Sequence, residues 1–339
     1  MVVIDLIELG PYTLPLVQAL ALAGQDVAER RGLLVRLSCE GLSGVGDVAP
    51  LPGFSRESIE QAHRVLDALP IIGEDIDIEG LLEGQPVAAL KGAPPSVCFG
   101  VECALLDLAA QRKPDTRNPM APRAGEVHVN ALLDEVTPEA VHTLAQQGYT
   151  CIKLKVGRQP LAADIAMVRS LVGVSDDVVV RLDANQAWSF SEACQFVNAL
   201  EGLLLEYLEE PCQSPQDSLR LMREAGVPVG FDESLVGASD DQLLAMQGAA
   251  AFVIKPTLAD GVSGAIRLAR AARRCGAEPV ISAAFESGVG IRALAHLANA
   301  LMSPGVAAGL DTWRWLAQDV LDHDGPRTGP VMRLGGEAE

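Results

Sequence analysis

The sequence lacks the features typical of nucleic-acid-binding and membrane proteins. It carries 45 acidic against 26 basic residues, a formal net charge of −19, and no basic run that could neutralise a phosphate backbone. No apolar run reaches about 18 residues without a charge or a turn breaker, as a membrane span requires. No charged, apolar and small-residue segment opens the chain as a signal peptide would. We therefore expect no nucleic-acid partner, no membrane span and a cytoplasmic location.

Sites built from cysteine, histidine or a nucleotide-binding loop are also unsupported. The seven cysteines are odd in number and never form a CxxC pair, and none of the five histidines stands in a recognised ligand spacing. This argues against a disulfide framework or a zinc knuckle. The Gly-Val-Gly segments at 44–46 and 288–290 lack the rest of a dinucleotide fingerprint, so we interpret them as turn glycines.

The sequence does contain enough apolar residues for a large core. It has 339 residues, 49% of them hydrophobic and 21% charged. The first third predicts a short strand at 33–37 and helices at 57–69 and 97–110, with Ser55 as the N-cap of the first helix. A stretch rich in proline and charge at 113–125 is typical of a linker. We predict an α+β capping domain over residues 1–112.

Eight short apolar segments follow, and most are separated by amphipathic helices such as 138–147 and 264–274. This alternation favours a parallel sheet closed as a barrel over a sandwich. We predict a modified (β/α)8 barrel of the TIM type over residues 113–315 and a tail, 316–339, that packs back on the cap. The strands are expected at 127–133, 150–156, 178–185, 203–209, 228–232, 251–256, 279–286 and 306–311.

Ionisable residues stand at the ends of six of these strands, 28, 26, 23, 23 and 31 residues apart. One βα unit takes up roughly 25 residues, and the active groups of such barrels lie at the carboxyl ends of the strands. We therefore expect six side chains around one barrel mouth: Lys155, Asp183, Glu209, Asp232, Lys255 and Glu286.

Alternation along the strands adds further polar groups to this mouth. Lys153 shares a side of its strand with Lys155, and Arg181 and Asn185 share a side with Asp183. If both strands are oriented alike, ammonium, guanidinium and carboxylate groups all project towards the mouth. Buried strand ends seldom hold so many charges without a use.

The three central carboxylates suit a divalent cation. Carboxylate oxygens favour Mg²⁺, with Mn²⁺ as a second possibility. Strand alternation and the 23-residue step to Asp232 favour Glu209 over Glu210 as the ligand. A nearby cation would also lower the pKa of a lysine from about 10.4, so that Lys155 could take a proton from carbon. The same cation would stabilise the enediolate formed when a carboxylate loses its α-proton.

Five segments together resemble the enolase superfamily, muconate-lactonizing subgroup, in order and spacing: KxK at 153–155, DxN at 183–185, EEP at 209–211, DES at 232–234 and IKP at 254–256. Each alone is explained by a solvated strand face or a turn, so their joint occurrence carries the resemblance. More narrowly, GVGDVAPLPGFS at 44–55 is similar to the cap loop of the o-succinylbenzoate synthase family. The likeness runs from about residue 31 to residue 315.

The resemblance implies an enolase-like fold and a Mg²⁺-assisted β-elimination of water from a small-molecule carboxylate, 2-succinyl-6-hydroxy-2,4-cyclohexadiene-1-carboxylate. The product would be 2-succinylbenzoate, on the way to menaquinone. Lys155 would be the base, with Lys255 across the ring as an electrostatic partner, in a monomer or homo-oligomer. The implied metal ligands are Asp183, Glu209 and Asp232, and the implied substrate-binding or supporting residues are Lys153, Arg181, Asn185, Glu233, Ser282, Glu286, Ser287 and Gly288.

Some positions depart from the family pattern and leave alternatives open. Val45 and Asp47 replace a tryptophan and a glutamate common in the cap loop, and Gln186 stands where a basic residue is frequent. An N-succinylamino acid racemase, a dipeptide epimerase or a muconate-type cycloisomerase would use the same metal and both lysines. A catalytically silent binding barrel is a further alternative. The family also leads us to expect a mobile lid around residues 14–29.

Overall fold

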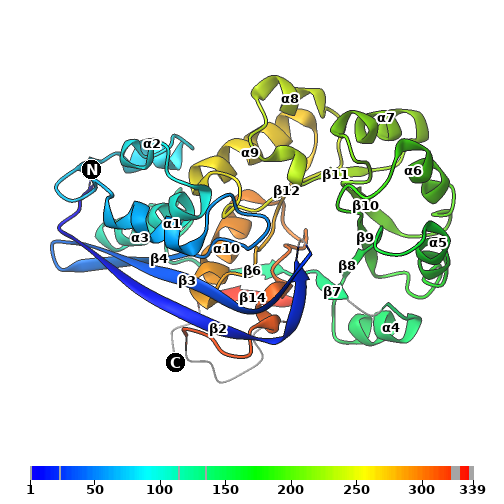
Figure 1. The fold of residues 1–339 in the computed structure, drawn as a ribbon, viewed down its shortest axis with the longest axis horizontal. Helices are drawn as coiled ribbons and strands as arrows, with labels where there is room; N and C mark the ends of the chain where they lie inside the picture. Colours follow the sequence, from blue (N-terminus) through cyan, green and yellow to red (C-terminus); the bar gives the residue numbers. More distant parts are fainter. Residues whose placement is uncertain (1, 23, 114, 134–135, 322–328, 336–339) are drawn as a thin grey trace.

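An α+β cap lies beside a curled parallel sheet surrounded by helices (Figure 1). The computed structural model describes the chain except for residues 1, 23, 114, 134–135, 322–328 and 336–339. The α-helices are α1 (Ile59–Asp67), α2 (Ile78–Leu82), α3 (Pro95–Arg112), α4 (Pro138–Gln146), α5 (Leu161–Arg169), α6 (Phe190–Val197), α7 (Pro215–Ala225), α8 (Asp240–Ala245), α9 (Gly261–Cys275) and α10 (Gly288–Leu301). Short 3-10 helices are η1 (Ala88–Leu90), η2 (Glu233–Leu235) and η3 (Asp311–Trp315).

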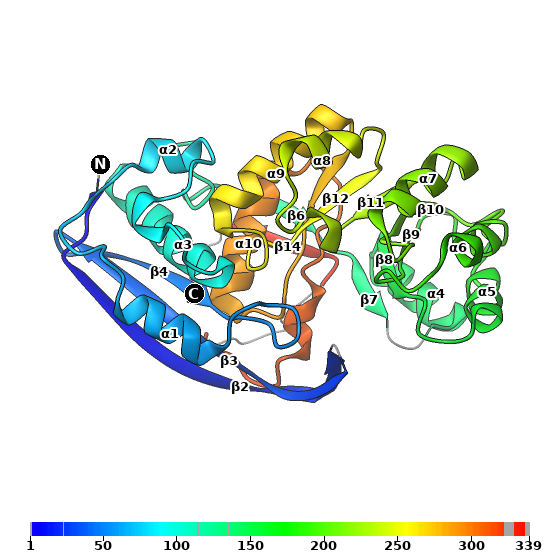
Figure 2. The same cartoon turned by 45° about the horizontal axis from the view of Figure 1, so that its top comes forward.

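The cap is built on a three-stranded antiparallel sheet in the order β2-β3-β4. These strands are β2 (Leu6–Leu22), β3 (Gln25–Cys39) and β4 (Leu42–Val48), and a separate pair is formed by β1 (Val2–Val3) and β5 (Asp75–Ile76). The β2–β3 hairpin is much longer than the predicted strand at 33–37, and its far end reaches η3 (Figure 2). The residues expected to form a lid, 14–29, form this far half of the hairpin.

Two local predictions in the cap are wrong. Ser58 rather than Ser55 caps α1: its hydroxyl accepts from Gln61 N while the Gln61 side chain accepts from Ser58 N, a reciprocal capping box. Gly44 and Gly46 are strand residues of β4 rather than turn residues, and in the barrel Gly288 and Gly290, given the same interpretation, lie in the first turn of α10. A Cβ on Gly46 would overlap the carbonyl oxygen of Gly100 in α3, so Gly44 and Gly46 allow α3 to lie directly on the sheet.

The barrel sheet has seven parallel strands, in the order β13-β12-β11-β10-β9-β8-β7. Nearly all of their residues are buried because helices cover the outer face. They are β7 (Ala131–Leu133), β8 (Cys151–Lys155), β9 (Val179–Asp183), β10 (Leu205–Glu209), β11 (Val229–Phe231), β12 (Ala251–Ile254) and β13 (Glu278–Ile281). The fold is therefore α/β with an enolase-like barrel and a separate antiparallel cap sheet.

The first and eighth predicted strands differ from the structure. The first is split into β6 (Gly125–His128), which pairs antiparallel with β14 (Val331–Leu334), and β7. The eighth forms no continuous strand, but Ala308 bridges to Val129 and Gly309 bridges to Ser282. This segment therefore closes the gap between the two edges of the sheet through isolated bridges, and the barrel is irregular at this point.

The tail after η3 contacts both parts of the molecule. Leu316 forms a bridge with Leu16 of the hairpin, whereas β14 pairs with β6. The domain boundaries at residues 112 and 315 stay a prediction. Within the described residues, no helix is both long enough and apolar enough to cross a membrane.

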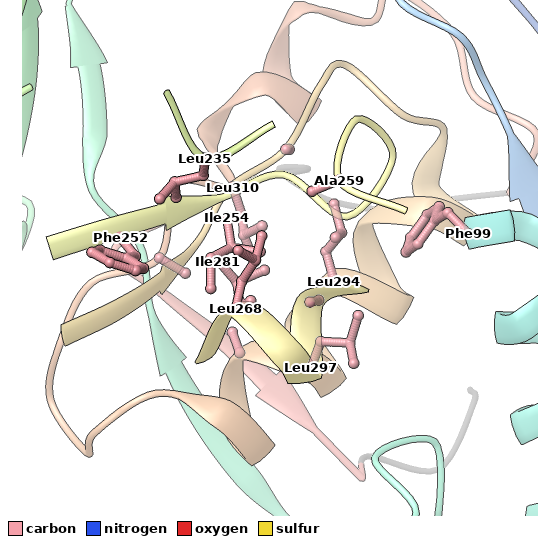
Figure 3. Close-up of a cluster of buried hydrophobic side chains, with 14 of the residues drawn as sticks. Phe99, Leu235, Phe252, Ile254, Ala259, Leu268, Ile281, Leu294, Leu297 and Leu310 are labelled. Carbon is pink, nitrogen blue, oxygen red and sulfur yellow. The ribbon is translucent and has the colours of Figure 1, made fainter. Parts of the chain in front are cut away.

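An apolar cluster joins the cap to the barrel. Figure 3 shows Phe99 of α3 on one side and Leu268, Leu294 and Leu297 of α9 and α10 close to the strand residues Ile254 and Ile281. Phe99 is fully buried, and burying a side chain of this size stabilises the fold by about 1.5–3 kcal/mol. The core thus fixes the position of the cap beside the barrel mouth.

Candidate active site

Three lysines and three carboxylates meet at the carboxyl ends of strands β8 to β12. Strand register brings them together: Lys155 pairs with Asp183, and Asp183 pairs with Glu209. Asp232 and Lys255 directly follow β11 and β12. Neighbouring parallel strands are about 4.8 Å apart, so side chains at matching levels on one face come within contact distance.

Ion pairs link these groups closely. Lys153 Nζ lies 2.7 Å from Glu209 Oε1 and 2.9 Å from Asp183 Oδ2. Lys155 Nζ lies 2.6 Å from the same Asp183 oxygen, and Lys255 pairs with Asp232. Asp183 and Glu209 are fully buried, while the Lys155 side chain keeps 24% of its surface exposed. Lys155 is therefore the most accessible of the three ammonium groups.

The surroundings shift the pKa values of the three lysines in different directions. Burial lowers the pKa of Lys155, and the charges of Lys153 and Lys255 add to this effect against the attraction of Asp183. Lys153 is also buried, but the carboxylates of Asp183 and Glu209 outweigh that burial and raise its pKa. Asp232 does the same for Lys255. Lys155 is thus the lysine that most readily gives up its proton.

The carboxylates differ in a similar way. Burial and the charge of Asp183 raise the pKa of Glu209 to about 8. Burial also opposes ionisation of Asp183, but the charges of Lys153 and Lys155 outweigh it and hold its pKa well below the usual range. Two neighbouring acids with opposite shifts are typical of a functional site, because the burial of charge is costly.

The donor set fits a hard divalent cation. In the part of the chain that the structure describes, no three acidic, histidine or cysteine side chains already surround a common metal position, because lysine ammonium groups lie between the carboxylates. Oxygen atoms remain for a cation, however. Glu209 Oε2 is buried and has no hydrogen-bond partner in the structure. Three carboxylates with an unpartnered buried oxygen suit Mg²⁺ better than zinc.

Asn185 and Glu233 complete the mouth around Lys155. Asn185 Oδ1 accepts from Lys155 Nζ at 2.6 Å, and its Nδ2 donates to Glu233 Oε1 at 2.9 Å. Asn185 has a positive φ of 44°, and its backbone N–H donates to Asp183 Oδ1. Asparagine adopts this left-handed conformation more readily than most residues with a side chain, and here the side-chain amide lies between Lys155 and Glu233.

Glu210 has a supporting role that the sequence analysis did not assign. Its Oε1 accepts from the backbone N–H groups of Asp232 and Ser234, both at 2.8 Å, and its Oε2 accepts from Ser234 Oγ and Gln186 Nε2. The carboxylate therefore holds the turn that carries Asp232. The place of Glu210 next to Glu209 in the EEP segment suggests only a possible metal ligand. No sequence signal indicates these contacts.

Arg181 does not reach the mouth, contrary to the prediction from strand alternation. It pairs with Lys153 and Tyr207 in register, one level below Asp183. Its guanidinium donates to Glu206 at 2.7 Å and to the carbonyl oxygen of Ala307. The alternation of side chains was right, but a long side chain can turn toward either end of the barrel. Arg181 thus ties strands together near the barrel floor.

The predicted residues after β13 connect parts of the fold instead of joining the lysine cluster. Ser282 Oγ lies 3.4 Å from the Gly309 carbonyl oxygen. Glu286 accepts from Thr257 Oγ1 at 2.5 Å, Ser287 donates to Asp47 of the cap from N and Oγ, and Gly288 N donates to Asp319 of the tail. Their hydrogen bonds hold the cap, barrel and tail together around the mouth.

Two cavities flank the lysine cluster. One, of about 190 Å³, lies between cap residues 54–57 and barrel residues that include Asp232 and Lys255. The other, of about 370 Å³, lies beside Lys155 and is lined also by Arg158. The groups with shifted pKa values therefore border space that a small molecule can enter.

Two solved structures with the same fold are epimerases. The L-Ala-D/L-Glu epimerase from Bacillus subtilis is 25% identical, with a TM-score of 0.83, over 98% of this chain and 96% of its own. A dipeptide epimerase from Enterococcus faecalis V583, solved with Mg and the dipeptide L-Leu-L-Tyr, is 21% identical with a TM-score of 0.82, over 99% of this chain and 98% of its own.

Curated relatives and protein families identify the chain more narrowly. The o-succinylbenzoate synthase of Pasteurella multocida (strain Pm70) is 31% identical over 99% of this chain and 98% of its own length. That of Citrobacter koseri is 35% identical over 89% and 88%. Residues 6–108 match the family described as MenC, N-terminal domain, and residues 135–334 match the family described as Enolase C-terminal domain-like. The chain therefore belongs to the o-succinylbenzoate synthase family of enzymes, within the enolase superfamily.

Proposed function

We propose that this enzyme removes water from 2-succinyl-6-hydroxy-2,4-cyclohexadiene-1-carboxylate and releases 2-succinylbenzoate, in the biosynthesis of menaquinone. The observation that carries the proposal is the state of Lys155, a partly exposed amine whose pKa is lowered by burial and by two further lysines, beside a cavity. A lysine whose pKa is lowered gives up its proton more readily, and the neutral amine can then abstract a proton from carbon. Membership of the synthase family supplies the substrate.

Lys155 is the base in this mechanism. Its Nζ takes the proton from the ring carbon that bears the carboxylate, and the same ammonium group returns that proton to the departing hydroxide. The C–H and C–O bonds break, a ring double bond forms, and water leaves. Asn185 orients the amine through its hydrogen bond at 2.6 Å. Because the product is aromatic, the main task of the protein is to acidify one C–H bond.

Lys255 acts as a fixed positive charge. Its pKa is raised by the carboxylate of Asp232, so it stays protonated while Lys155 exchanges a proton. An ammonium group held in a water-poor site stabilises negative charge on the ring as it develops.

Asp183, Glu209 and Asp232 are the residues that would hold Mg²⁺, with Mn²⁺ as a substitute. A bound divalent cation would stabilise the negative charge that grows on the substrate carboxylate. The support is the all-oxygen donor set, the unpartnered Glu209 Oε2 and the presence of Mg in two dipeptide epimerases of the same fold. Glu210 would keep Asp232 in place through the backbone contacts of its turn.

An N-succinylamino acid racemase is the second candidate, because Lys155 and Lys255 both carry an ammonium group into the same cluster. Racemisation needs each lysine to exchange a proton with Cα. Deuterium incorporation at Cα of N-succinylamino acids in heavy water would reveal that activity. Dehydration alone leaves these compounds unlabelled.

The proposed reaction is tested by product identification. Purified protein is incubated with the cyclohexadiene substrate and Mg²⁺. The products are then separated by chromatography and identified by mass spectrometry. We expect 2-succinylbenzoate to appear faster than in a protein-free sample. No product above that background would contradict the proposal. A cytoplasmic location and a monomeric or homo-oligomeric state remain predictions.

A further inference from the structure

We propose that Arg56 of the cap loop binds the terminal carboxylate of the succinyl chain and so selects substrates with two carboxylates. This inference rests on the proposed function, since it assigns the second carboxylate of that substrate. Its basis is the cavity of about 190 Å³ between cap residues 54–57 and the barrel face of Asp232 and Lys255. Arg56 lines this cavity from the cap side.

The guanidinium of Arg56 has no ionic partner among the described residues. Within the residues that the structure describes, it is exposed and forms no hydrogen bond or ion pair. Its Nη2 lies 3.6 Å from the position that a Cβ would take on Gly237, so the guanidinium lies against the barrel loop that follows Asp232. A planar guanidinium presents paired donors that match a carboxylate.

The other charged groups of this cavity have partners of their own, although Glu57 Oε2 and Glu233 Oε2 are buried without a hydrogen-bond partner. Lys255 pairs with Asp232. Glu233 accepts from Asn185, and Glu57 accepts from Ser96 N and Oγ. Arg56 is consequently the lining cation that is available to an incoming anion, since no ion pair joins it to Glu57 or Glu233 among the described residues.

The lining of the cavity combines an apolar wall with the guanidinium of Arg56, as a succinyl chain with a terminal carboxylate requires. Phe54 and Val236 keep 39% and 38% of their surfaces exposed, and with Leu258 they give the cavity an apolar wall. The ring carboxylate belongs at the lysine cluster, so the ketone and two methylenes would run along this wall toward Arg56. A local cation is needed there because the chain as a whole carries −19 and repels a dianion.

The test compares two ligands that differ in one carboxylate. 2-Succinylbenzoate has the terminal carboxylate, and 2-butyrylbenzoate replaces it with a methyl group. Dissociation constants are measured by calorimetry with Mg²⁺ present for wild type, Arg56→Gln, Arg56→Lys and a control, Arg64→Gln, which changes an exposed arginine of α1 outside the cavity. Melting temperatures verify that each variant folds.

We expect Arg56→Gln to raise the dissociation constant of 2-succinylbenzoate by about 10- to 100-fold, the range of a lost charge-assisted hydrogen bond. The dissociation constant of 2-butyrylbenzoate should stay within about twofold of the wild-type value. Arg56→Lys should recover part of the loss, Arg64→Gln should match wild type, and KM should rise more than kcat falls. Equal affinity of wild type and Arg56→Gln, or equal weakening of both ligands, would overturn the assignment. If wild type itself fails to convert the diene, the proposed function fails, and this inference fails with it.

Discussion

Lys155 is the residue on which the proposed chemistry depends most. It lies at the mouth of the barrel and touches Asp183 and Asn185. The shift in its pKa depends on burial and on neighbouring charges, which come from Lys153 of the same strand and from Asp183, Glu209 and Lys255 elsewhere in the barrel. The sequence places the lysine at a strand end, but only the folded arrangement makes it a base.

We predict that Lys155→Ala lowers kcat by about 10²–10⁴-fold, the usual contribution of a general base, while the protein stays folded. The side chain keeps 24% of its surface exposed, and the ion pair of Lys153 with Asp183 does not depend on it. Loss of diene absorbance measures the rate, and circular dichroism measures the fold. Lys113→Ala, which alters an exposed lysine after α3, is the control. A folded Lys155→Ala protein with the wild-type rate would refute the base assignment.

Glu102 is a buried acid that has no part in the proposed reaction. It lies in α3, and its carboxylate accepts from Ser263 N at 2.9 Å and Ser263 Oγ at 2.7 Å in α9. Burial raises its pKa from 4.5 to about 7, although the bonds from Ser263 act in the other direction. The folded state therefore holds its proton more tightly than the unfolded chain does.

This difference predicts a pH dependence of stability. A raised folded-state pKa stabilises the protein fully below about pH 4.5 and stops doing so as the pH rises through about 7. The contribution is on the order of 3 kcal/mol at most. We expect the free energy of unfolding of wild type, relative to Glu102→Gln, to fall between pH 5 and pH 8 in urea titrations. A constant difference across that range would show that Glu102 does not titrate as described.

At the scale of elements, strand β3 holds the cap loop and the barrel together through Arg30. The buried guanidinium donates to the carbonyl oxygens of Ala49 and Pro50 in the cap loop and of Phe285 in the loop after β13. The arginine therefore fixes the loop that leads to the proposed binding residue Arg56.

We predict that Arg30→Ala lowers the free energy of unfolding by about 3–5 kcal/mol, because it leaves several buried acceptors unpaired and opens a cavity. The neighbouring Arg31 is exposed and pairs with an exposed Glu60 at 2.9 Å. Arg31→Ala should therefore cost no more than about 1 kcal/mol. Denaturant unfolding compares the two variants. Equal losses would contradict the role given to Arg30.

The repeating elements of the barrel follow from the sequence because each obeys a local rule. The five strands from β8 to β12 fall where apolar segments end in charged residues, whereas β13 ends at Ile281, before Glu286. Strand alternation explains why Lys153 joins Lys155. The spacing of the acids also predicts that Asp183 and Glu209 meet at one barrel mouth, and in the structure the two residues pair in register. Periodicity and chain length sufficed for these features.

Other elements depend on contacts that no local rule contains. Gly44 and Gly46 were taken for turn residues because their need for space is set by α3, more than 50 residues away. The eighth predicted strand forms only isolated bridges, to Val129 on one side and to Ser282 on the other. The direction of Arg181 and the contacts of Glu210 likewise depend on tertiary neighbours. Sequence patterns could not predict them.

At the scale of the whole molecule, the cap and the barrel are held together around the barrel mouth by hydrogen bonds and apolar contacts. Asp47 of the cap accepts from Ser287, Arg30 reaches the loop at Phe285, and Phe99 packs in the shared apolar cluster (Figure 3). The cap contributes a wall of one cavity, while the barrel contributes the lysines and carboxylates. Chemistry and substrate selection are thus assigned to different parts of the chain.

The central claim is that a cation held by Asp183, Glu209 and Asp232 enables Lys155 to start the elimination. The most direct measurement is the initial rate of diene absorbance loss as Mg²⁺ is titrated into chelator-treated protein. We predict no rate above background without Mg²⁺, saturation as Mg²⁺ is added, and a need for more Mg²⁺ in Asp183→Asn. A full rate in excess chelator would contradict the account.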